Sequence, residues 1–149
     1  PGHPRLIVGG CRGVPTDALR AACTHPDMRG ECDRIGGRHL LDDAMRFLLT
    51  RDEAAAASAR AVLLGGLACS DGYEQTPAGG HALAYDWIWS TLSVDDRRSI
   101  ESALTGCAAN ITTALRGEAP HLWHGFTSQA SALALIALVL HKINPGVAS

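Results

Sequence analysis

The chain has 149 residues, and its 13 basic and 15 acidic residues give a formal net charge of −2. This length suits one ordinary domain, and the charge balance argues against a general nucleic-acid binder, which would carry a basic stripe. Hydrophobic residues make up 46% of the chain but aromatic residues only 5%, so alanine and leucine supply the apolar content and favour closely packed helices. A local cluster of arginine and histidine could still attract an acidic ligand.

Proline and glycine in residues 1–15 predict an extended lead-in. A short helix is predicted over 16–23, after which Pro26 and Gly30 interrupt regular structure. Apolar residues return with helical spacing over 33–48, which predicts the next helix.

The sequence TRDE at Thr50–Glu53 has the pattern of a capping box, so we expect a helix that begins there and reaches about residue 69. Residues 70–80 have the composition of a loop. Residues 81–92 then predict a short apolar helix. On this helix Trp87 and Trp89 are two positions apart and cannot both face the core.

A second Ser-x-x-acid pattern at Ser93–Asp96 predicts the start of a long helix that runs to about residue 115. A loop over 116–125 leads to the last helix, 126–142, and we find no convincing strand. Short connections between helices give antiparallel neighbours, so the predicted fold class is all-α.

The last helix is apolar on almost every face, because residues 130–140 contain one polar side chain, Ser131. A helix of this kind is buried on most sides, which a single 149-residue bundle can hardly provide. We therefore expect it to pack against further layers of a larger protein or to support self-association.

Five cysteines are present, and none belongs to a CxxC motif or has zinc-type spacing. They are Cys11, Cys23, Cys32, Cys69 and Cys107. The simplest interpretation is that they pack as small buried hydrophobic residues in the reduced state. A disulfide among the first three is the alternative, because those three lie in a loop-rich segment.

No segment of the chain is predicted to enter a membrane. The longest apolar run, 132–140, is much shorter than the roughly 20 residues that span a bilayer. The first ten residues do not have the pattern of a signal peptide.

Four segments, taken in order and with their spacing, carry a family resemblance. They are HPRLIV at 3–8, LLTRDEAAAASARAVLL at 48–64, HALAYDWIWSTLSVDDRRSIESAL at 81–104 and HLWHGFTSQASALALIALVL at 121–140. Together they resemble the heparinase II/III-like and alginate-lyase-like polysaccharide lyases, and the segment 81–104 is the most specific. The resemblance implies that residues 1–149 form a single all-α domain, in which antiparallel helical hairpins build the N-terminal portion of a larger, here incomplete, (α/α) toroid. It also implies a periplasmic or secreted protein.

The resemblance further implies cleavage of acidic, uronate-containing polysaccharides by β-elimination, without a cofactor. His124 is similar to the active-site histidine that the family carries at the mouth of a helix. A helix N-terminus attracts an anionic group and keeps an imidazole neutral, so His124 could accept the C5 proton. A capping or packing role is the alternative for this histidine.

Four further residues are candidate substrate contacts. Trp123 could stack on a sugar ring, His121 could add a polar contact, Gln129 could supply an amide one turn into the helix, and Tyr73 lies in a predicted loop. His121 and His124 also form an HxxH pair, but no second ligand pair accompanies it, so we expect no metal.

The chain departs from the family at two places. Leu122 and Trp123 stand where the family commonly has an asparagine, and the family's catalytic tyrosine falls beyond Ser149. Whether this chain is an enzyme by itself is therefore open, and a non-catalytic glycan- or protein-binding helical module is the alternative function. Tyr85 is expected to pack, with its hydroxyl bonded to one partner.

Overall fold

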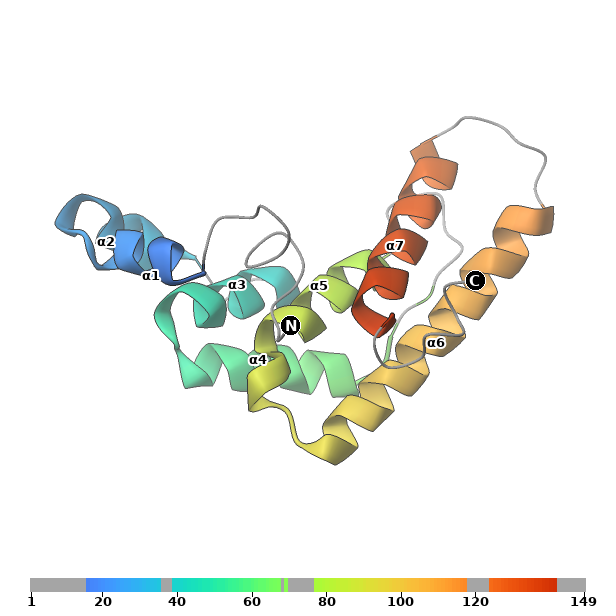
Figure 1. Ribbon diagram of the computed structural model, residues 1–149, viewed down its shortest axis with the longest axis horizontal. Helices are drawn as coiled ribbons and strands as arrows, with labels where there is room; N and C mark the ends of the chain where they lie inside the picture. The colour runs from blue at the N-terminus through green and yellow to red at the C-terminus, as the bar shows by residue number, and fades with distance from the viewer. Residues whose placement is uncertain (1–15, 36–38, 68, 70–76, 118–123, 142–149) are drawn as a thin grey trace.

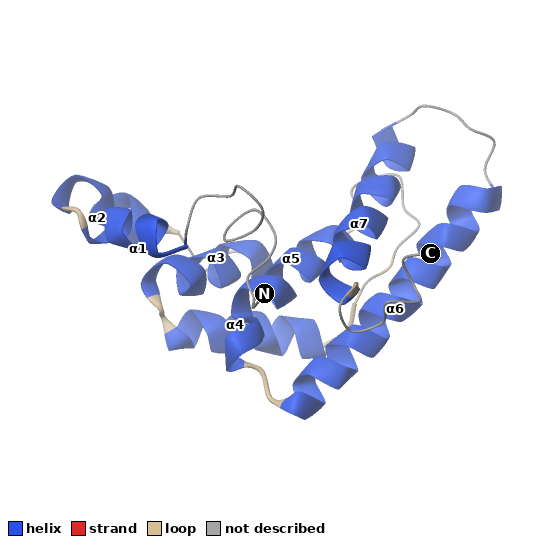
Figure 2. Cartoon of the chain, in the orientation of Figure 1, coloured by secondary structure: helices blue, strands red, loops and turns tan. Residues whose placement is uncertain are grey.

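Helices make up nearly all of the regular structure in the computed structural model, which describes residues 16–35, 39–67, 69, 77–117 and 124–141. In chain order they are α1 (Thr16–Thr24), α2 (Pro26–Arg34), α3 (Leu40–Thr50), α4 (Glu53–Leu64), α5 (Ala78–Ile88), the 3₁₀ helix η1 (Trp89–Thr91), α6 (Val94–Gly117) and α7 (His124–Leu140). Within these residues no strand is formed (Figure 2). The predicted all-α class is confirmed.

The helices are spread along the length of the molecule, and α7 lies between α5 and α6 (Figure 1). The α1–α2 pair lies at one end and packs on α3, and α6 and α7 lie at the other end. Between them, α5 packs against α3, α4, α6 and α7. The centre of the structure is therefore a helix that touches most of the others.

The core surrounds α5, whose small residues let its neighbours approach closely. Its largest fully buried side chains include Tyr85, Phe47, Leu48, Leu63, Ile88, Ile100, Leu104, Ile136 and Val139. Gly79 lies where α5 meets α7, and a Cβ atom there would be 3.3 Å from the Cα atom of Ala132. The absence of a side chain at this position sets how closely the two helices pack.

Residues 26–34 form α2, so the predicted interruption at Pro26 and Gly30 is wrong. Pro26 occupies the first helical position, where its missing N–H group has no helical partner to lose. His25 caps this end, because its Nδ1 atom accepts a hydrogen bond of 3.4 Å from the backbone N–H of Asp27. Gly30 sits in the middle of the helix, at a cost of up to about 1 kcal/mol.

The turn between α3 and α4 also differs from the prediction, because α4 is capped by Asp52 and not by Thr50. The Asp52 carboxylate accepts hydrogen bonds from the backbone N–H groups of Ala54 and Ala55, at 3.0 and 3.3 Å. Thr50 ends α3, and its hydroxyl donates to a carbonyl one turn earlier. Arg51 between them adopts a left-handed backbone with φ of 63°, a conformation that usually selects glycine or asparagine.

The capping box predicted at the start of α6 is confirmed. The backbone N–H of Asp96 donates to the Ser93 hydroxyl, and the N–H of Ser93 donates to the Asp96 carboxylate, both at 3.1 Å. Arg60 of α4 binds the same carboxylate through two hydrogen bonds, of 2.7 and 2.9 Å. These bonds, first among them those from Arg60, hold the pKa of Asp96 well below its usual range. The box therefore also ties α4 to α6.

Four cysteines form two disulfides, so the reduced state expected for them is wrong. Cys23 of α1 pairs with Cys32 of α2, which is the alternative among the first three cysteines, and Cys69 pairs with Cys107 of α6. Their Cα atoms are 5.7 and 5.2 Å apart, within the range that a disulfide can bridge. The second pair is formed by residues 38 positions apart, and nothing in the local sequence indicates it.

The apolar helix α7 is covered on the faces that meet α5 and α6 and exposed elsewhere. Ile136 and Val139 are almost fully buried, whereas Leu138 is 57% exposed. Among the described residues, no helix is both long and apolar enough to span a membrane.

Candidate functional site

Two of the five sequence-predicted site residues, His124 and Gln129, belong to α7. His124 is the first residue of this helix, as expected for a histidine at a helix mouth, but only its backbone is described. His121, Trp123 and Tyr73 lie outside the described residues. Gln129 is described and is 3% exposed.

Gln129 is unusual because its amide is buried without full pairing. Its Oε1 atom has no hydrogen-bond partner in the described part of the chain. Burying an unpaired amide atom costs about 1–3 kcal/mol, so such a group calls for an explanation. A 180° rotation of the amide exchanges its oxygen and nitrogen, so this position could offer either an acceptor or a donor to a ligand.

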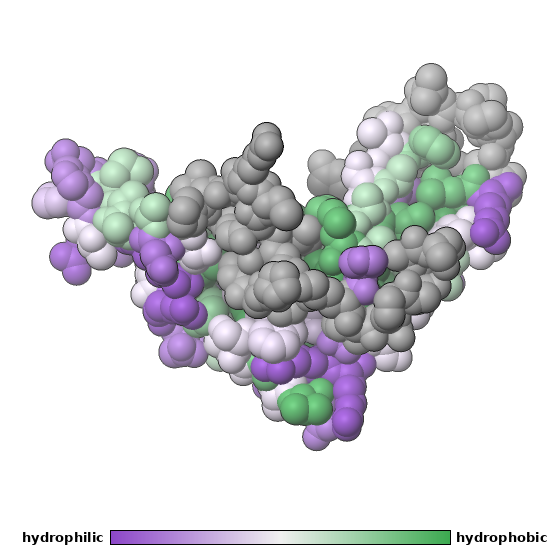
Figure 3. All heavy atoms as spheres, viewed as in Figure 1, coloured by the Kyte–Doolittle hydropathy of each residue, from purple (hydrophilic) through white to green (hydrophobic). Residues whose placement is uncertain are grey.

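A groove of about 640 Å³ runs between α6 and α7. Its α6 wall consists of Thr105, Ala108, Ala109, Thr112, Thr113 and Arg116, and its α7 wall of Leu133, Ile136, Ala137 and Leu140. Apolar residues gather over this part of the surface in Figure 3. One wall is thus wholly apolar, and the other carries hydroxyls and one cation.

The three threonines leave acceptor sites facing this region. Thr105, Thr112 and Thr113 each donate their hydroxyl hydrogen to the carbonyl four residues earlier, at 2.8, 2.7 and 3.0 Å. A hydroxyl oxygen that donates one hydrogen bond can still accept others. Arg116 is exposed and forms no ion pair with any described residue. These groups could bind a ligand that has hydroxyls and a negative charge.

Gln129 extends the apolar wall of the groove toward the start of α7. It precedes Leu133 by four positions, Ile136 by seven and Leu140 by eleven, which is the spacing of one helix face. The predicted amide contact and the groove therefore share one stripe of α7.

Tyr85 has the structural role predicted for it. Its side chain is fully buried on α5, and its hydroxyl donates a hydrogen bond to Glu101 of α6. Burial, and next the bond to Glu101, raise the pKa of Tyr85 far above its usual value of 10.0. This hydroxyl therefore serves to join α5 to α6 inside the core.

The two tryptophans of this region divide as predicted, with Trp87 buried and Trp89 partly exposed. The guanidinium carbon of Arg97 lies 3.6 Å from the centre of the Trp89 ring, a cation–π contact. Arg97 of α6 therefore packs on the aromatic ring that begins η1.

Replacing Tyr85 with phenylalanine should lower the free energy of unfolding by about 1–2 kcal/mol, because Glu101 loses a buried donor. It should also change the response to alkaline pH. Since folding raises the pKa of Tyr85, the folded state keeps a proton that the unfolded state releases above about pH 10, so stability falls there. Urea unfolding of both proteins from neutral pH upward tests this, and an equally steep alkaline loss in the variant would contradict it.

The described residues contain no group of three or more His, Cys, Asp or Glu side chains that could hold a metal ion. Comparisons of the chain with protein-family models, with curated proteins and with solved structures find no match. The resemblance to polysaccharide lyases therefore stays a prediction.

The groove residues were not among the sequence-predicted contacts. Thr105, Thr112, Thr113 and Arg116 recur at spacings of seven, one and three, which places them on one face of α6. That spacing was the available signal. It could not show that α7 packs beside this face, because the two stripes meet only in the folded chain.

Proposed function

We propose that the groove between α6 and α7 binds an acidic, uronate-containing polysaccharide, and that this chain is the N-terminal portion of an (α/α) toroid in a polysaccharide lyase-like protein. The observation that carries the proposal is the make-up of the groove, with an apolar wall facing a hydroxyl-bearing wall that ends in Arg116. The two disulfides fit the oxidising compartment that the proposal implies.

The ring face, the hydroxyls and the carboxylate of a uronate can each be paired with residues that line the groove. The C–H face of a sugar ring packs against Leu133 and Leu140, and its hydroxyls donate to the threonine oxygens of α6. The guanidinium of Arg116 pairs with the uronate carboxylate through two parallel hydrogen bonds, the strongest arrangement for these groups.

Elimination would start from the histidine at the start of α7. The imidazole of His124 takes the C5 proton, the C5–H electrons form the C4=C5 double bond, and the C4–O bond breaks. Arg116 or the amide of Gln129 neutralises the carboxylate charge during this step. The leaving oxygen takes up the proton that His124 removed from C5, or one from water, because Tyr85, buried against Glu101, does not supply it.

A binding module without elimination is the second candidate. The buried state of Tyr85 favours it, because a hydroxyl enclosed in the core and bonded to Glu101 does not reach a ligand in the groove. The two candidates share the groove and differ only in whether a bond is broken.

An NMR titration of the chain with alginate, hyaluronan and chondroitin oligosaccharides tests the binding step. The Arg116→Gln variant should bind roughly 10–100-fold more weakly, which corresponds to the loss of about 1.5–3 kcal/mol from a charged hydrogen bond. Arg98→Gln is the matched control, because Arg98 is also an exposed arginine of α6 but pairs with Asp95 and does not line the groove. Equal losses in both variants, or no binding at all, would reject the groove as the site.

The elimination step has its own readout, the ultraviolet absorbance of the unsaturated uronate product. Product formation that disappears in His124→Ala, with binding retained, would select the lyase. Binding without product would select the module.

A further inference from the structure

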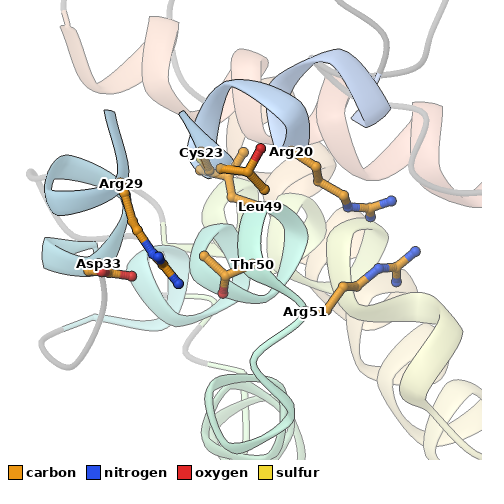
Figure 4. A pocket seen from close by; sticks show the side chains of 8 residues that line it. Arg20, Cys23, Arg29, Asp33, Leu49, Thr50 and Arg51 are labelled. Carbon is orange, nitrogen blue, oxygen red and sulfur yellow. The ribbon is translucent and has the colours of Figure 1, made fainter. Parts of the chain in front are cut away.

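A second pocket lies at the other end of the molecule, among α1, α2 and the end of α3 (Figures 1 and 4). Its volume is about 390 Å³. It is lined by Arg20, Cys23, Thr24, Arg29, Asp33, Leu49, Thr50 and Arg51. Three arginines and one aspartate therefore line one small space, in a chain whose formal net charge is −2.

The three arginines come from three different elements. Arg20 belongs to α1, Arg29 belongs to α2, and Arg51 directly follows α3. In Figure 4 the guanidinium groups of Arg20 and Arg51 lie on one side of the pocket, and Arg29 lies across from them near Asp33. Guanidinium groups repel one another, so the closeness of Arg20 and Arg51 needs a compensating anion or a structural reason.

A structural reason accounts for only part of this cluster. Arg20 donates from Nε to the carbonyl of Leu48 at 2.8 Å and from one terminal nitrogen to Asp17 at 3.3 Å, so it helps to cap α3. Burial, and next the charge of Arg51, lower the pKa of Arg20. Arg29 forms no ion pair with any described residue. The one contact of the Arg51 side chain within the same part of the chain is a cation–π contact with Phe47 at 5.4 Å.

The backbone at Arg51 supports a functional role. Its φ of 63° is the left-handed conformation of a helix C-terminus, where glycine is favoured and an arginine is disfavoured. The backbone conformation at position 51 thus favours glycine, and the chain nevertheless has arginine there.

The disulfide holds the two helices that carry the other arginines. Arg20 precedes Cys23 by three positions, and Arg29 precedes Cys32 by three positions. Residues three apart share a helix face, so the Cys23–Cys32 bond brings the two arginine-bearing faces together. The pocket is in this way organised before any ligand binds.

We propose that this pocket binds an oxoanion, a sulfate or phosphate group. Arginine guanidinium groups bind such anions through paired hydrogen bonds. The three arginines carry one positive charge more than Asp33 and Asp17, the partner of Arg20, can neutralise. The volume exceeds the needs of a bare ion and leaves room for the group that carries it as an ester. The site is separate from the α6–α7 groove and does not depend on the function proposed for that groove.

Side-chain NMR of the arginine Nε–H groups tests the site directly. The protein is titrated with inorganic sulfate, inorganic phosphate and glucosamine 6-sulfate, with chloride keeping the ionic strength constant. Glucosamine, which has no sulfate ester, is the control. We expect saturable shifts of the Arg20, Arg29 and Arg51 signals. Tighter binding of the sulfated sugar than of the inorganic ions identifies an ester as the ligand, and equal binding identifies the free ion.

The variant Arg51→Gly should weaken binding at least tenfold while the protein stays folded, because glycine suits the left-handed backbone. Arg34→Gln is the matched control, since Arg34 lies on α2, as Arg29 does, but pairs with Glu31 and does not line the pocket. The absence of saturable shifts with every probe, or equal binding by the wild type and Arg51→Gly, would overturn the proposal. Neither result affects the Arg116 titration, which uses unsulfated uronates.

Discussion

Removing the Cys69–Cys107 disulfide should lower the free energy of unfolding by about 4 kcal/mol, the largest single loss expected in this structure. The bond closes a loop between residues 38 positions apart, and the chain-entropy relation gives this value for a loop of that length. It joins the segment before α5 to a fully buried position on α6. Without this bond, the unfolded segment between Cys69 and Cys107, which includes the residues of α5, gains conformational entropy.

Urea unfolding of the Cys69→Ala/Cys107→Ala double variant measures the loss. The matched control is Cys23→Ala/Cys32→Ala, whose loop of nine positions predicts a smaller loss of about 2.6 kcal/mol. Mass spectrometry of the unreduced, proteolysed protein should recover peptides joined through Cys69 and Cys107. A larger loss in the control than in the first variant would contradict this account.

Replacing Gly79 with valine should cost about 2–3 kcal/mol through overpacking. Even the first added atom, Cβ, would lie 3.3 Å from the Ala132 Cα atom and 3.3 Å from Leu135 Cδ1. The Cα atom belongs to the backbone of α7, which cannot retreat without loosening its packing against α5. Thermal unfolding followed by circular dichroism should show a markedly lower midpoint.

The neighbouring glycine provides the control. A Cβ atom at Gly80 would approach only the flexible side chain of Leu41, at 3.4 Å from its Cδ1 atom. Alanine is favoured over glycine inside a helix by up to about 1 kcal/mol, so Gly80→Ala should be neutral or stabilising. If Gly79→Val matches the wild type in stability, α5 and α7 do not cross this closely in solution.

Local signals predicted the fold well where a helix start depends on adjacent residues. The Ser93–Asp96 capping box is one such case, since both partners lie within four positions. Residues 26–34 were missed, because Pro26 and Gly30 indicate a break when they are considered singly. Proline at a first helical position is compatible with the helix, and the bond between Cys23 and Cys32 holds α2 against α1.

The candidate sites were harder to predict than the helices. The sequence placed His124 at a helix mouth, and it begins α7. The arginine pocket could not be predicted in the same way, because Arg20, Arg29 and Arg51 meet only after three elements pack. One signal was visible, the repeated Arg-x-x-Cys pattern at 20–23 and 29–32, but its meaning depends on the disulfide.

The left-handed residue after α3 also has an evolutionary consequence. Selection for a stable turn favours glycine at position 51, and selection for anion capture favours arginine. Homologous chains should therefore divide into two groups at this one position. Homologues that no longer bind the anion should have glycine or asparagine at position 51. The residue at this one position would then indicate which homologues have kept the pocket.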